Sequence, residues 1–210
     1  MSPDAANPKQ SVTGNCSGAA VAFHGGSFDP VHLGHLIMAQ DAFEQFDLER
    51  VYFIPAAQNP LKANAPGASF VDRVNMLRRA VAGDKRFDVL ELEQQLPSPS
   101  YTLQTVEALR VLMPGKRFYW IIGSDQLRDL HRWHRIGVLV QLVEFICVAR
   151  PCDPMELPPI DGLRVHSLKA HQVDISSTEI RRRIHGGMPV DFYLHHGVFT
   201  YINELRLYTS

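Results

Sequence analysis

The sequence predicts an α/β fold: a doubly wound parallel sheet with helices on both faces, followed by a helical C-terminal portion. Short, almost wholly apolar runs occur at residues 19–23, 118–122 and 144–149, as expected for strands buried on both faces of a sheet. Between them lie longer segments in which apolar residues recur at helical spacing. Strands that alternate with helices build a parallel sheet, and such sheets bind ligands at the carboxyl ends of their strands.

Up to residue 113, the predicted strands alternate with predicted helices. In order they are a strand at 19–23, a helix at 32–46, a strand at 51–54, a helix at 69–82, a strand at 87–92 and a helix at 102–113. Ser69 with Asp72 resembles a capping box that opens the second helix, and Gly83 ends that helix.

The second half of the chain continues the alternation. Its expected elements are a strand at 118–122, a helix in two pieces at 125–142 around Trp133, strands at 144–149 and 163–168, and helices at 176–186 and 197–208. The proline-rich segment 151–162 is expected to be a surface connection, and Ser176 with Glu179 forms a second capping box.

Length, charge and cysteine content narrow the class of protein. The 210 residues fit one domain at 19–210 preceded by a loose tail at 1–18, and the net charge of −1 gives no general attraction for nucleic acid or anionic membranes. Three cysteines are few, and an odd number cannot all pair within the chain, so a secreted disulfide scaffold is disfavoured. The N-terminus has no apolar signal segment and no run could span a bilayer, so we expect a cytoplasmic protein.

The first candidate site follows the first strand and reads GGSFDPVHLGH. Gly25 and Gly26 let a ligand approach the backbone, and the helix start after Ser27 and Phe28 offers free N–H groups to a phosphate. His32 and His35 lie three residues apart, so both imidazoles can face one phosphate. The alternatives are a tight turn with two ordinary histidines, or a zinc site, which has only His24 nearby as a third ligand.

The second candidate site is the helix start ISSTEIR at residues 175–181. Its hydroxyls and the arginine one turn later suit phosphate groups. Taken by itself, the segment is better explained as an ordinary capped helix with a solvated face of Arg181, Arg182 and Arg183; the first candidate site reverses that preference. Together, the two segments resemble the signatures of the nucleotidyltransferase superfamily that carries His-x-Gly-His and Ile-Ser-Ser-Thr-x-Ile-Arg motifs. This resemblance implies a Rossmann-like nucleotidyltransferase fold.

Elements between these motifs resemble one enzyme family within that superfamily. Ser100-Tyr101-Thr102 and Gly123-x-Asp125 followed by Trp133 are similar to elements of bacterial nicotinate-mononucleotide adenylyltransferases. The resemblance covers residues 19–208. It implies a transferase of NAD biosynthesis that joins ATP and nicotinate mononucleotide into deamido-NAD and releases pyrophosphate, with Mg²⁺ held mainly by the phosphates and not by protein side chains.

The resemblance also implies roles for individual residues. The catalytic residues would be His32, His35 and Arg181. The ATP-binding residues would be Gly25, Gly26, Ser27, Phe28, His32, His35, Lys62, Gly123, Asp125, Ser176, Ser177, Thr178 and Arg181. The residues that bind nicotinate mononucleotide would be Ser100, Tyr101, Thr102 and Trp133. Leu61 stands where relatives often carry histidine before the lysine, and His131 and His134 are expected to be surface residues of a helix.

Other activities remain as alternatives. Phosphopantetheine adenylyltransferase and other adenylyl- or cytidylyltransferases share both phosphate motifs, and a nucleotide sensor without catalytic activity could share the fold. A dehydrogenase is disfavoured because no G-x-G-x-x-G follows the first strand, and a class I aminoacyl-tRNA synthetase would need a longer chain with a lysine-rich signature. We expect no nucleic acid or membrane partner; the sequence leaves a homo-oligomer open.

Overall fold

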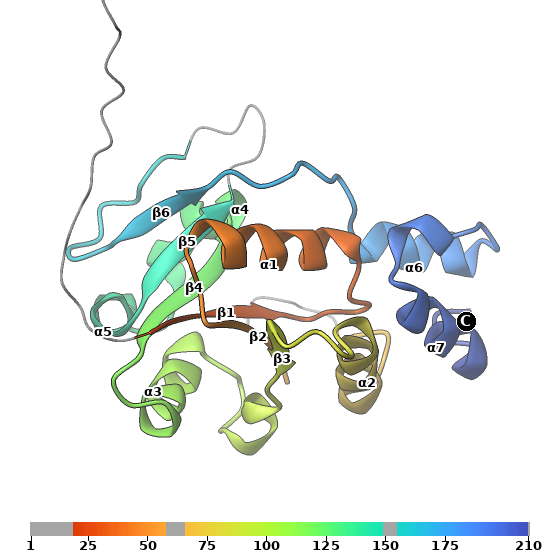
Figure 1. Ribbon diagram of the computed structural model, residues 1–210, viewed down its shortest axis with the longest axis horizontal. Helices are drawn as coiled ribbons and strands as arrows, with labels where there is room; N and C mark the ends of the chain where they lie inside the picture. The colour runs from red at the N-terminus through yellow and green to blue at the C-terminus, as the bar shows by residue number, and fades with distance from the viewer. Residues whose placement is uncertain (1–18, 58–65, 149–154, 210) are drawn as a thin grey trace, which may run out of the picture.

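A computed structural model describes residues 19–57, 66–148 and 155–209 of the chain (Figure 1). The predicted tail at 1–18, Lys62 and the cysteines Cys16 and Cys152 lie outside these residues. All strands run parallel in one six-stranded sheet with the order β3-β2-β1-β4-β5-β6, which confirms the doubly wound prediction. The strands are β1 (Ala20–Gly26), β2 (Arg50–Pro55), β3 (Phe87–Val89), β4 (Arg117–Gly123), β5 (Glu144–Val148) and β6 (Val165–Leu168).

The helices follow the predicted order with adjusted ends. They are α1 (Leu33–Gln45), α2 (Phe70–Ala80), α3 (Thr102–Leu112), α4 (Ser124–Arg128), α5 (Ile136–Leu142), α6 (Ser177–His185) and α7 (His196–Leu205), with 3-10 helices η1 (Leu92–Gln95), η2 (Leu130–Arg132) and η3 (Asp191–Tyr193). The strand predicted at 87–92 ends at Val89, and Leu92 already begins η1. The last helix ends at Leu205, because Arg206 adopts a left-handed conformation with φ of 51°.

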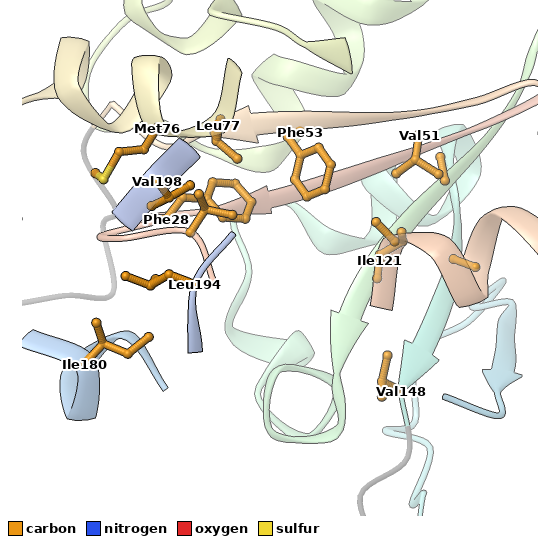
Figure 2. Close-up of a cluster of buried hydrophobic side chains, with 14 of the residues drawn as sticks. Phe28, Val51, Phe53, Met76, Leu77, Ile121, Val148, Ile180, Leu194 and Val198 are labelled. Carbon is orange, nitrogen blue, oxygen red and sulfur yellow. The ribbon is translucent and has the colours of Figure 1, made fainter. Parts of the chain in front are cut away.

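Alternate residues of the strands face two separate cores. In β1, Ala22 packs in one cluster with α1, α2 and the C-terminal helices, whereas Val21 and Phe23 pack in the other cluster with α3, α4 and α5. This two-sided burial explains why the strands read as continuous apolar runs. Figure 2 shows part of the first cluster, where Met76 and Leu77 of α2 lie close to Val198 of α7.

The C-terminal helices belong to this first layer. Ile180 of α6 and Val198 and Ile202 of α7 are buried in the cluster that contains Phe28 and Met76. In Figure 1, α6 and α7 lie beyond the sheet, next to the start of α1. The predicted helical C-terminal portion therefore lies beside the carboxyl end of β1. No helix among the described residues is long and apolar enough to cross a membrane.

Candidate active site

Two cavities flank the segment that leaves β1 at the carboxyl edge of the sheet. One cavity, of about 330 Å³, is lined by the start of α3 and is called the α3 cavity here. The other, of about 350 Å³, is lined by the start of α6 and is called the α6 cavity. Gly25 and Gly26 line the α3 cavity, whereas the next residues, Ser27, Phe28 and Asp29, line the α6 cavity. One short loop thus separates two spaces, each large enough for part of a nucleotide-sized ligand.

In the α6 cavity, the histidines His32 and His35 come together as their spacing predicts. His32 caps α1 and His35 lies in its first turn, and their rings stack with centroids 3.7 Å apart. The backbone N–H of His32 donates to Nδ1 of His35 across 3.3 Å. Because Nδ1 of His35 accepts that bond, the proton of the neutral ring sits on Nε2, which is then a hydrogen-bond donor.

Burial keeps His32 uncharged at neutral pH. Removal from water lowers the pKa of His32 to about 4. The neighbouring His24, at the end of β1, also has its pKa lowered to about 4, first by burial and then by the charge that His32 would carry. His24 and His32 are therefore neutral at pH 7, and a neutral imidazole such as that of His32 can still donate a hydrogen bond to a phosphate.

Phe28 packs against two histidines of this region, His24 and His35. It is fully buried and adopts a left-handed backbone conformation with φ of 48°, which is unfavourable for a bulky residue. Its ring packs edge-on against His24 at 5.3 Å and against His35 at 5.0 Å. Phe28 also lines the α6 cavity, so its predicted place among the ATP-binding residues stays a prediction, and its ring contacts the imidazoles of His24 and His35.

Asp29 ties the loop after β1 to distant segments. Its carboxylate accepts bonds from the backbone N–H groups of Gly67 at 2.8 Å and Ala68 at 3.0 Å, and from the hydroxyl of Tyr208 at 2.8 Å. Burial and the carboxylate together raise the pKa of Tyr208, so its hydroxyl stays protonated as a donor. The motif aspartate thus holds the loop in shape, and the end of the chain takes part in it.

The start of α6 faces the same loop. Ser176 caps the helix by accepting the N–H of Glu179 at 3.2 Å, and Ser177 donates to the carbonyl oxygen of Pro30 at 2.9 Å. Arg181 donates to the carbonyl oxygen of Asp29 at 2.7 Å and lies 3.4 Å from the hydroxyl of Thr178. Together with Ser176, Ser177 and Thr178, Arg181 lines the α6 cavity, so the two predicted phosphate motifs meet in one space.

Arg73 of α2 is a site residue that the sequence pattern did not single out. It is fully buried, and its Nη1 donates to the carbonyl oxygens of Ser27 at 2.7 Å and Ala56 at 2.9 Å. These carbonyls follow β1 and β2, so one guanidinium joins the ends of two strands beside both cavities. Its position within a predicted helix gave no signal of this role.

In the α3 cavity, the predicted mononucleotide-binding residues come together. Ser100, Tyr101, Thr102 and Trp133 all line it. The Trp133 ring lies edge-on to Phe145, with ring centroids 6.3 Å apart, and this contact orients the indole ring against the core. The backbone N–H of Tyr101 donates to the side chain of Gln104, and α3 begins at the next residue, so the first turn of α3 opens onto this cavity.

Three further residues of the α3 cavity were missed or misjudged. Buried Glu93 accepts the N–H of Ala57 at 3.2 Å and the hydroxyl of Thr105 at 3.1 Å, and burial raises the pKa of its carboxyl. Arg132 also lines this cavity. His134 is exposed, as predicted, but it lies in the turn after η2 and not in a helix, and its ring stacks on Tyr101 at 4.3 Å. Its proximity to Tyr101 depends on tertiary packing that no local pattern shows.

Some predicted ATP-binding residues do not reach either cavity. Gly123 and Asp125 lie where β4 passes into α4, and the side chain of Asp125 is exposed. Neither residue lines the α3 or the α6 cavity. Lys62 lies outside the described residues, so its role stays a prediction.

Comparison with known proteins identifies the family. A family model described as cytidylyltransferase-like matches residues 23–183. A probable nicotinate-nucleotide adenylyltransferase of Opitutus terrae is 47% identical over 189 residues, which cover 90% of this chain and 97% of that protein. This chain belongs to the nicotinate-nucleotide adenylyltransferase family. A second member, from Methylacidiphilum infernorum, is 41% identical and covers 90% of this chain and 91% of its own.

Solved structures share the fold of this nicotinate-nucleotide adenylyltransferase family member. The nicotinic acid mononucleotide adenylyltransferase of Plasmodium falciparum, solved with NaAD, has a TM-score of 0.71 at 20% identity and covers 90% of this chain and 97% of its own. A nicotinate-nucleotide adenylyltransferase structure from Vibrio parahaemolyticus has a TM-score of 0.67 at 16% identity, with 91% and 96% covered. The doubly wound nucleotidyltransferase fold is thus common to proteins of low sequence similarity.

Proposed function

We propose that this protein transfers the adenylyl group of ATP to nicotinate mononucleotide, giving deamido-NAD and pyrophosphate for NAD biosynthesis. The observation that carries the proposal is the pair of cavities on either side of the loop at 25–29. The α6 cavity has histidines, hydroxyls and an arginine suited to a triphosphate, and the α3 cavity has aromatic rings and a helix start suited to an anionic pyridine nucleotide. Relatives at 41–47% identity carry the name of this activity.

The reaction needs no enzymatic base. A phosphate oxygen of nicotinate mononucleotide, already anionic at neutral pH, attacks the α-phosphorus of ATP. The bond from that phosphorus to the bridging oxygen breaks, and pyrophosphate leaves with its electron pair. Catalysis then consists of alignment and charge stabilisation, and alignment alone can contribute about 7–11 kcal/mol.

The α6 cavity residues would supply the charge stabilisation. In the proposal, Nε2–H of His35 donates to an oxygen on the reacting phosphorus, and His32 lies beside it. Ser177, Thr178 and Arg181 hold the distal phosphates. Because Arg181 also bonds to Asp29, the distal phosphates and the loop between the cavities share one guanidinium. That link would couple a bound triphosphate to the loop at which the second substrate arrives.

We also propose that Mg²⁺ enters with the triphosphate. Residues 19–57, 66–148 and 155–209 contain no cluster of three histidine, cysteine or acidic side chains placed to hold a metal ion. The nearby carboxylate of Asp29 is already occupied by Gly67, Ala68 and Tyr208. The donor set therefore fits an ion whose ligands are phosphate oxygens and water; when bound, it would neutralise charge on the departing pyrophosphate.

A turnover panel tests the proposal against its alternatives. The protein is incubated with ATP and, in separate reactions, nicotinate mononucleotide, nicotinamide mononucleotide or phosphopantetheine, and pyrophosphate release is followed. We expect rapid release with nicotinate mononucleotide and little with the others. Preference for phosphopantetheine would assign the chain to the sister activity, and no release with any acceptor would favour a nucleotide sensor.

A further inference from the structure

A buried carboxylate orients a histidine at the rim of the α6 cavity. Asp41 of α1 is buried, and its Oδ1 lies 2.8 Å from Nδ1 of His171. Its other oxygen, Oδ2, accepts the backbone N–H of His171 at 2.7 Å. His171 is one of the residues that line the cavity, and its side chain is 82% exposed. One carboxylate therefore holds both the backbone and the ring of a residue that lines the α6 cavity.

This contact determines what the free ring nitrogen can do. A carboxylate only accepts hydrogen bonds, so Nδ1 of His171 carries the proton that points at Asp41. In the neutral ring, Nε2 then has a lone pair and acts as an acceptor. An acceptor at this position repels a phosphate oxygen or a carbonyl and favours an N–H donor of the ligand.

The position of His171 places it at the base end of a bound nucleotide. The chain between β6 and α6 runs along α1 in the opposite direction, with Lys169 bonded to Gln45, His171 to Asp41, and Ser177 to Pro30 (Figure 1). Asp41 is six residues beyond His35, or about 9 Å along the helix at the usual rise. The ribose of a nucleotide separates its base from its α-phosphate. A nucleotide with its phosphates at His35 would thus bring its base toward His171.

Apolar residues also line this cavity, namely Met38, Val148, Ala170, Val173 and Ile175. Met38 lies between His35 and Asp41 on α1, and Ala170 is the chain neighbour of His171. These two residues give the part of the cavity next to His171 an apolar lining that suits a flat ring.

We propose that the Asp41–His171 pair selects a 6-aminopurine over a 6-oxopurine in the α6 cavity. Nε2 of His171 accepts a hydrogen bond from the exocyclic amino group of adenine, and the carbonyl of a 6-oxopurine presents a second lone pair there instead. The inference rests on the proposed function for which cavity takes the nucleoside triphosphate. His171 is a specificity-determining residue, and Asp41 is a positioning residue that acts through it.

The test compares ATP with inosine triphosphate in two readouts. Dissociation constants are measured by equilibrium dialysis, and kcat/KM is measured with nicotinate mononucleotide as acceptor. We expect the wild-type protein to prefer ATP. His171→Ala should reduce the ATP-to-inosine-triphosphate ratio about tenfold, because one hydrogen bond to a solvent-exposed ring is of modest strength. His185→Ala, an exposed histidine on α6, is the matched control and should leave the ratio unchanged.

Asp41→Asn supplies a readout that simple damage to the site would not produce. The amide oxygen must turn to the backbone N–H of His171, so the amide NH₂ faces Nδ1 and the ring proton moves to Nε2. Nε2 becomes a donor, and the variant should bind inosine triphosphate more tightly than the wild-type protein does. Unchanged nucleotide ratios in His171→Ala, or an equal loss for both nucleotides in both variants, would overturn the inference. Absence of turnover with a retained binding preference would contradict the proposed function alone.

Discussion

The stacked histidines at the start of α1 carry the most specific chemistry in the molecule. His32 ends the loop after β1, and the first turn of α1 brings His35 against it at 3.7 Å between ring centroids. The bond from the His32 N–H to Nδ1 of His35 places the proton of the neutral His35 ring on Nε2. A local spacing of three residues is therefore enough to bring the two imidazoles together at the start of α1, where we propose that they contact the transferring phosphate.

Replacement of His35 by alanine tests this role. We expect kcat to fall by roughly 10²–10³-fold, as on removal of one preorganised donor, with a melting temperature close to that of the wild-type protein. His32→Ala should have a similar effect on kcat. The measurements are steady-state kinetics and thermal unfolding, with exposed His131→Ala as control. A folded His35→Ala protein with near-normal turnover would remove His35 from the mechanism.

The buried imidazoles also predict how stability depends on pH. His24 and His32 have folded-state pKa values of about 4, below the ordinary 6.5, so between these values the unfolded chain binds protons that the folded protein does not. The free energy of unfolding should therefore fall as pH decreases from about 6.5 to 4, by at most ~3 kcal/mol per histidine. Urea unfolding across this range measures the slope. His24→Gln should flatten it, and exposed His131→Gln should not; a slope unaffected by His24→Gln would refute the assignment.

At this scale, the sequence predicts residues whose partners are near in the chain. His32, His35, Ser176 and Ser177 could be predicted to lie at helix starts beside one cavity, because each helix start has its own local sequence pattern. Arg73 and His171 were not found, because their roles come from contacts 46 and 130 residues away in the chain. Neither apolar periodicity nor a helix-cap pattern in the sequence indicates contacts between residues so far apart in the chain.

Among the elements, the start of α3 is the best candidate for discrimination between pyridine substrates. Its first N–H groups open onto the cavity that Trp133 also lines, and such donors favour an anionic carboxylate over an amide that carries its own N–H groups. We expect kcat/KM for nicotinate mononucleotide to exceed that for nicotinamide mononucleotide by about 10²-fold or more.

The same experiment with Trp133→Ala separates stacking from selection. The indole should stack equally on both flat rings, so kcat/KM should fall for both substrates while their ratio stays nearly constant. If the ratio of the two kcat/KM values fell to near one in Trp133→Ala, the tryptophan and not the helix start would be responsible for the selection. Comparable wild-type values for the two substrates would contradict the argument from α3.

The start of α6 is the corresponding element for the triphosphate. Arg181 bonds to the carbonyl oxygen of Asp29, and its guanidinium can still present further N–H groups to phosphate oxygens. Lysine keeps the charge but loses this fork, so Arg181→Lys should raise KM for ATP clearly and KM for nicotinate mononucleotide little. Initial-rate kinetics with each substrate varied in turn gives both constants. Equal increases would show that Arg181 acts only on the shared loop.

Helix and strand order were predictable, but several ends were not. The predicted helix at 69–82 ends at Ala80, and the one at 197–208 ends at Leu205, because backbone turns interrupt an apolar pattern that continues. Leu207 and Tyr208 satisfy that pattern by packing back onto the first core cluster. Apolar spacing in the sequence indicates which residues are buried, and residues after the last turn of a helix can still be buried.

For the whole molecule, the sheet order explains why two motifs 150 residues apart form one site. The order β3-β2-β1-β4-β5-β6 places the switch point beside the carboxyl end of β1, where the α3 and α6 cavities flank the loop at 25–29. The fold class was predictable because buried parallel strands leave a strong sequence pattern. We propose that residues 19–210 act as a single nucleotidyltransferase domain, with both substrates held at this edge.

The most direct test of the account follows the α-phosphorus of ATP through the reaction. The protein is incubated with nicotinate mononucleotide and ATP labelled with ³²P at the α-position, and the products are separated by chromatography. We expect the label to appear in deamido-NAD, in equal amount to the unlabelled pyrophosphate released. Label that remains in ATP, or appears in AMP without dinucleotide, would contradict adenylyl transfer between the two cavities.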